Sequence, residues 1–145
     1  MKVHRHLLTR ASLVGVFCLV VGSAAVVAKP KPLKGRFSGA GFTFSGQLTH
    51  LGHFTGEITS FTPTPTGGDT TATWTAANGD QVFVSTIFTV TGFNPSTGFF
   101  TFSQAITIVG GNGRFAGATG SATAVGETAG DFSSYSGDIN GSIDY

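Results

Sequence analysis

The chain has 145 residues, of which 22 are Gly and 14 are Phe, and it carries 8 Lys and Arg against 7 Asp and Glu. Residues 29 to 145 contain no Cys, which excludes a disulfide framework for that part of the chain. Four of its five basic side chains lie between residues 29 and 36, so the remainder has no basic stripe for phosphates. A nucleic-acid partner is therefore not expected.

Residues 1 to 28 have the order of parts of a signal peptide. Three basic residues precede an apolar stretch that begins at Ala11, and small residues follow. Cleavage is expected after Ala25 or Ala28, preferably after Ala28, and an uncleaved anchor is the alternative. Cleavage would remove Cys18 with the signal peptide. We expect a secreted, periplasmic or envelope protein without a membrane segment after cleavage, with a basic, proline-containing linker at residues 29–34 and one domain at 35–145.

The residues after 29 predict strands and almost no helix. Val82 and Val84 alternate with Phe83 and Ser85, and this period of two indicates strands with one buried face. Thirteen of the Phe lie in this part, and about ten are expected to fill the interior. The predicted strands are residues 35–48, 52–62, 70–77, 80–92, 98–109, 119–127 and 131–144, the last divisible at Gly137 or Gly141.

Turn residues divide these strands. Asn78-Gly79 predicts a type I′ hairpin, residues 94–98 predict a longer loop, and residues 63–68 cannot pair as a central strand because of their two prolines. Exposed sheet edges promote aggregation, and closure removes them. We therefore predict a single antiparallel barrel of seven to eight strands, with a β-sandwich as the alternative.

A weak repeat runs through the chain in the form glycine, polar residue, Phe, small residue, then Gly or Ser. It begins at Gly35, Gly52, Gly113 and Gly130, and each pair is offset by 17 residues. This offset predicts two neighbouring strands per pair, with Phe filling the interior. A chance match is the alternative in a chain so rich in Gly and Phe.

The glycine-rich segment from Val109 to Gly120 resembles an element of a known group of proteins. It is similar to the strand-turn-strand element of the allene oxide cyclase and dirigent barrels, with Asn112 where that pattern usually has Thr. The chain also resembles small uncharacterised exported bacterial proteins with this element, a segment like Thr49–Gly52 and a hairpin like Asn78–Asp80. The resemblance implies an eight-stranded barrel and carries over no catalytic residue. It implies a structural turn built from Gly110, Gly111, Gly113, Arg114 and Gly117.

Few residues suggest catalysis, metal binding or anion binding. His50 and His53 could share a metal only if Gly52 bends the backbone, and a structural role is preferred, so no metal or cofactor is expected. A barrel could bring two of the carboxylates Glu57, Asp80 and Glu127 together as an acid–base pair, although surface solvation is the preferred explanation for all three. Arg114 is expected to satisfy carbonyls or to pair with an acid rather than to bind an anion.

Ligand-pocket candidates are the aromatic residues Trp74, Phe83 and Phe88, together with His50 and Glu57. Core packing explains the aromatic residues equally well. Three hypotheses of function follow. The first is a non-enzymatic exported protein that acts through a surface partner or in the envelope. The second is a carrier of a small apolar molecule. The third is a cyclase-like or dirigent-like isomerase, which rests on fold analogy alone.

Overall fold

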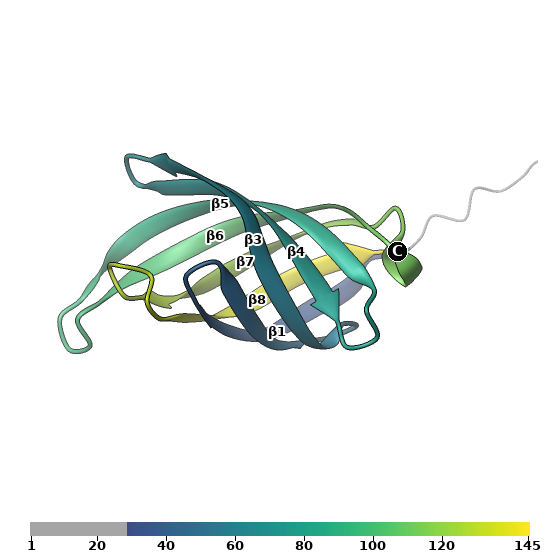
Figure 1. The fold of residues 1–145 in the computed structure, drawn as a ribbon, viewed down its shortest axis with the longest axis horizontal. Coiled ribbons are helices and arrows are strands. Elements are labelled where there is room, and N and C mark those ends of the chain that lie inside the picture. The colour runs from purple at the N-terminus through teal and green to yellow at the C-terminus, as the bar shows by residue number, and fades with distance from the viewer. Residues whose placement is uncertain (1–28) are drawn as a thin grey trace, which may run out of the picture.

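The computed structural model of the protein describes residues 29–145, which form a closed barrel of eight antiparallel strands (Figure 1). Each strand pairs with the next along the chain, and the first pairs with the last. This confirms the all-β barrel and excludes the sandwich. The expected signal-peptide helix lies outside the described residues. The elements are β1 (Lys31–Ala40), β2 (Thr43–Leu48), β3 (Gly52–Thr64), β4 (Gly67–Ala76), β5 (Gln81–Asn94), β6 (Phe99–Gly111), the short 3₁₀ helix η1 (Gly113–Phe115), β7 (Thr119–Thr128) and β8 (Tyr135–Asp144).

Strand β5 shows how the sequence pattern becomes the barrel wall. Val82, Val84 and Phe88 are buried in the interior, whereas Phe83 and Ile87 are exposed on the outside. This is the alternation that a strand with one buried face requires. The inner face of β7 carries only Gly and Ala before Thr128, which leaves room for larger side chains from the opposite wall.

The first predicted strand is corrected in two ways. β1 begins at Lys31, inside the expected linker, because Leu33 is fully buried and the Lys31 ammonium lies 3.5 Å from the centre of the Tyr145 ring. The range 35–48 is two strands, joined by the loop of Gly41 and Phe42. Gly41 has a φ of 58°, and glycine at the first position of a two-residue hairpin loop adopts this conformation without strain.

The turn at Asn78 and Gly79 joins β4 to β5 as predicted, but its type differs. Within the described chain only Gly79 of this pair has a positive φ, at 88°, whereas a type I′ turn needs two. The amide of Gly79 donates to the Ala76 carbonyl at 2.9 Å, and the amide of Ala76 donates to the Asp80 carbonyl at 2.8 Å. These bonds indicate a type I turn followed by a glycine bulge.

The third strand is longer than predicted and includes the first of the two prolines. β3 continues to Thr64, and Pro63 is in register with Gly68 of β4. β2 pairs with β3 only as far as Glu57, so Pro63 lies on an edge where no ladder hydrogen bond is lost on the β2 side.

The two ends of the barrel differ. The β2–β3 and β4–β5 turns, η1 and the C-terminus lie at one end, called here the closed end. Phe115 of η1 is fully buried there, with its ring 4.8 Å from that of Tyr145. At the other end, called the open end, the β3–β4 and β5–β6 hairpins extend beyond their neighbours (Figure 1). The closed end is therefore filled, whereas the open end is framed by loops.

The glycine–Phe repeat does not mark neighbouring strands. Its first two copies lie in β1 and β3, which β2 separates. The third copy forms η1 at the closed end, and the fourth lies in the β7–β8 loop at the open end. Fewer Phe are buried than expected, because Phe44 is only partly buried in the core and others point outward or lie on the open-end loops and hairpins. The buried ones are Phe37, Phe54, Phe88, Phe102 and Phe115.

Candidate functional site

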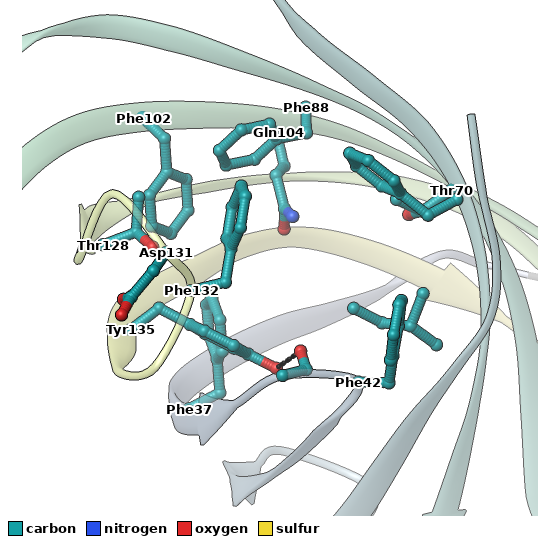
Figure 2. A pocket seen from close by; sticks show the side chains of 13 residues that line it. Phe37, Phe42, Thr70, Phe88, Phe102, Gln104, Thr128, Asp131, Phe132 and Tyr135 are labelled. Atoms are coloured by element: carbon teal, nitrogen blue, oxygen red, sulfur yellow. Dashed lines mark hydrogen bonds between the residues drawn. The ribbon is translucent and has the colours of Figure 1, made fainter. Parts of the chain in front are cut away.

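An apolar cavity of about 230 Å³ lies inside the open end of the barrel (Figure 2). The β1–β2 turn, the β7–β8 loop and the inner faces of β3 to β6 contribute to its wall. The cavity is lined by rings that are themselves packed against one another. The Phe88 ring lies 5.3 Å from that of Phe102, and the Phe37 ring lies 6.5 Å from that of Phe102. The three rings are buried and form one continuous apolar wall.

Two β-bulges shape the rim of the cavity. The register shifts between Ile58 and Ser60 on β3 and between Val90 and Gly92 on β5. A bulge bends its strand and increases the local twist. The hairpins that follow these bulges therefore leave the barrel wall, and the mouth stays open between them.

Phe132 of the β7–β8 loop covers part of the mouth. Its ring lies 5.8 Å from that of Phe88 and 6.3 Å from that of Phe61. Phe132 has a φ of 58°, which is strained for a bulky side chain. Its carbonyl accepts a hydrogen bond of 2.8 Å from the amide of Gly41, which holds the loop against the β1–β2 turn.

The floor of the cavity is partly polar. Thr70 and Thr86 are buried and share a hydrogen bond between their hydroxyl groups. Gln104 of β6 points its amide into the cavity (Figure 2). Below this floor lies a second cavity of about 40 Å³, which Trp74 lines. Gln104 and Ile58 line both cavities, so they mark the boundary between them.

Two ionisable side chains line the larger cavity. The Tyr135 hydroxyl donates to the carbonyls of Gly41 and Thr43, at 3.2 and 3.0 Å. Burial raises the pKa of Tyr135 above its ordinary value of 10.0. Asp131 is exposed at the rim, and hydrogen bonds from the side chain and the backbone amide of Ser133 lower the pKa of its carboxyl group. At neutral pH the tyrosine is neutral and the aspartate is ionised.

The five residues expected to form a pocket are not brought together. Phe88 lines the larger cavity and Trp74 the smaller one. Phe83 points outward from β5 and is 37% exposed. Glu57 is exposed on β3, in register with threonines on both sides, and His50 lies in the β2–β3 turn at the closed end. The outward direction of Phe83 and Glu57 follows from the alternation along their strands.

The glycine-rich segment lies at the closed end, where Arg114 connects three turns. Its guanidinium donates to the carbonyl of His50, and its Nε lies 3.7 Å from the carboxylate of Asp80. Gly113 and Gly117 have φ values of 57° and 75°. Within residues 29–145, no three His, Cys, Asp or Glu side chains are grouped as metal ligands would be.

Several cavity residues were missed in the sequence. Gln104, Phe102 and Tyr135 belong to predicted strands, but no motif singled them out. A signal was present on residues 98–109, where Gln104 stands on the same face as Phe102 and Ile106. A lone amide on an otherwise apolar strand face indicates a polar group directed into the interior. Phe132 gave no comparable signal, because its position depends on the conformation of a loop.

No family model, curated protein or solved structure matches this chain. Among the residues that the structure describes, no helix has the length and apolar character needed to cross a membrane.

Proposed function

We propose that the protein binds one small, neutral, apolar molecule in the cavity at the open end of the barrel. The observation that carries this proposal is the cavity of about 230 Å³ whose wall includes the packed rings of Phe37, Phe88 and Phe102. An apolar cavity of about 150 Å³ is large enough to bind benzene, and most sites for larger ligands exceed about 300 Å³. The volume therefore suits a molecule of one or two rings.

The charge at the cavity favours a neutral ligand. Asp131 places an ionised carboxylate at the rim, and none of the described residues that line the cavity is basic. A fatty acid or another anion would meet repulsion at the mouth without a cation to pair with inside. The Phe-rich wall gains from burial of apolar surface, at about 25 cal/mol per Å² removed from water.

Binding accounts for the cavity more simply than a reaction does. A cyclase-like site would need a buried acid with a polar partner. Here the carboxylate of Asp131 is exposed, and the hydroxyl of Tyr135 already donates to two backbone carbonyls. We accordingly propose an exported carrier without enzymatic activity, and we retain kinship with the allene oxide cyclase and dirigent barrels as a proposal that rests on the glycine-rich segment.

Filling the cavity tests this function. Ile58→Trp places a larger ring between the two cavities, whereas Ile87→Trp makes the same exchange on the outer surface, where Ile87 is 60% exposed. We expect isothermal titration calorimetry to show saturable 1:1 binding of naphthalene to the unaltered protein and to Ile87→Trp. The Ile58→Trp variant should lose that binding while it remains folded. Equal binding by all three proteins, or no saturable binding by the unaltered protein, contradicts the proposal.

A further inference from the structure

Gln104 is the polar side chain of the cavity that has no partner in the barrel. It stands on the inner face of β6, in register with Phe88 of β5 and with Ala124 of β7. Ala124 is small and fully buried, so it leaves space beside the amide. Among the described residues, none donates a hydrogen bond to the side-chain amide of Gln104 or accepts one from it. The amide is not sealed from solvent, and its end points into the cavity (Figure 2).

The other uncharged polar side chains that line the cavity already make hydrogen bonds. The hydroxyl groups of Thr70 and Thr86 bond to each other. The Thr128 hydroxyl donates to the carbonyl of Ala129 at 2.9 Å, and the Tyr135 hydroxyl donates to the carbonyls of Gly41 and Thr43. Gln104 is thus left with a free donor and a free acceptor at the cavity floor.

We infer that the ligand carries one hydroxyl or carbonyl group at the end that enters the barrel first, and that Gln104 hydrogen bonds to it. This inference rests on the proposed function and specifies the class of ligand. A pure hydrocarbon would strip water from the amide of Gln104 and leave it unpaired, which weakens binding by roughly tenfold or more. A ligand with an apolar ring and one neutral polar group satisfies both the Phe wall and the amide.

The test compares two ligands of nearly the same shape, naphthalene and 2-naphthol. Each is titrated into the purified unaltered protein, into Gln104→Leu and into Gln47→Leu. Gln47 lies on the exposed face of β2, so the second variant makes the same exchange away from the cavity. If Gln104→Leu does not fold, Gln104→Met takes its place, because Met has a similar length and is apolar.

The measured quantity is the ratio of the two dissociation constants in each protein. We expect Gln104→Leu to lower the preference for 2-naphthol over naphthalene by roughly two- to tenfold, the contribution of one hydrogen bond. Gln47→Leu should leave the ratio unchanged. An identical ratio in all three proteins overturns the role of Gln104 and leaves the cavity proposal standing. If the unaltered protein binds neither compound, the proposed function fails and this inference fails with it.

Discussion

The ring of Phe132 lies 5.8 Å from the ring of Phe88, which joins the β7–β8 loop to strand β5 across the mouth of the cavity. Phe132 makes this contact from a backbone conformation with a φ of 58°. A strained residue at the mouth of a cavity is a common arrangement at binding sites, where neighbouring contacts hold it in place. Here the neighbouring contact is the hydrogen bond between the Phe132 carbonyl and the amide of Gly41.

Replacing Phe132 separates the effect of the ring from that of the backbone. Asn tolerates a positive φ and Ala does not, so Phe132→Asn should be more stable than Phe132→Ala by about 1 kcal/mol. Both variants remove the ring, and both should release naphthalene faster than the unaltered protein. Chemical denaturation and stopped-flow dissociation measure the two effects. Equal stabilities of the two variants would contradict the observed backbone conformation.

Gly111 and Gly110 provide a matched pair in the glycine-rich segment. A Cβ atom on Gly111 would lie 2.5 Å from the carbonyl oxygen of Gln81 and 2.6 Å from that of Phe115. Gly111→Ala should therefore lower the free energy of unfolding by roughly 1 to 3 kcal/mol. A Cβ on Gly110 would meet its nearest atom at 3.7 Å, so Gly110→Ala should be neutral or stabilising by up to about 1 kcal/mol. Thermal denaturation of both variants checks the difference, and a similar loss in both would count against this packing.

Arg114 and Arg36 both pair with an aspartate, but in different surroundings. Arg114 reaches the carbonyl of His50 and the carboxylate of Asp80, and its side chain is 44% exposed. Arg36 lies 3.0 Å from Asp138 with 88% of its side chain exposed. We expect Arg114→Ala to lower the stability by about 1 to 2 kcal/mol and Arg36→Ala by less than about 0.5 kcal/mol. Urea denaturation gives both values, and a larger loss for Arg36→Ala would refute the ranking.

We expect the protein to lose stability in alkaline solution, because the hydroxyl group of Tyr135 is buried. Its pKa is raised by burial in the folded protein, whereas the unfolded chain titrates near 10. Above pH 10 the unfolded state loses a proton that the folded state retains, so the free energy of unfolding falls as the pH rises toward the folded pKa. Tyr135→Phe removes this contribution. Its stability should fall less steeply above pH 10 than that of the unaltered protein, and parallel curves would contradict the burial of the hydroxyl.

The barrel could be predicted because its signals are local and periodic. The alternation along residues 80–92 identified β5, and exposed sheet edges favoured closure. The loop at Gly41 was missed because residues on both sides of it alternate between inward and outward positions. The change of the inward positions from odd numbers in β1 to even numbers in β2 was overlooked. The strand character of Lys31 to Lys34 was missed because two prolines suggested a linker, although β1 pairs there with β8, more than 100 residues away.

The site was harder to predict than the fold. Phe88 was chosen as an aromatic residue in a strand, and the same criterion selected Phe83, which points outward. Deciding between neighbours in a strand requires the register of the whole barrel. The place of Gln104 on an apolar strand face was visible in the sequence, but the hydrogen-bond partners of the other cavity residues were not. A side-chain amide without a hydrogen-bond partner can be recognised only when the positions of all neighbouring polar groups are known.

The most direct measurement is a two-dimensional NMR titration of the isotope-labelled protein with naphthalene. Binding in the cavity predicts that the largest shifts occur at Ile58, Phe88, Gln104 and Tyr135, which line it. The signal of Phe115, buried at the closed end, should barely move. Shifts centred on the outer face around Phe83, or no saturable shifts at all, would contradict the binding of an apolar molecule inside the barrel.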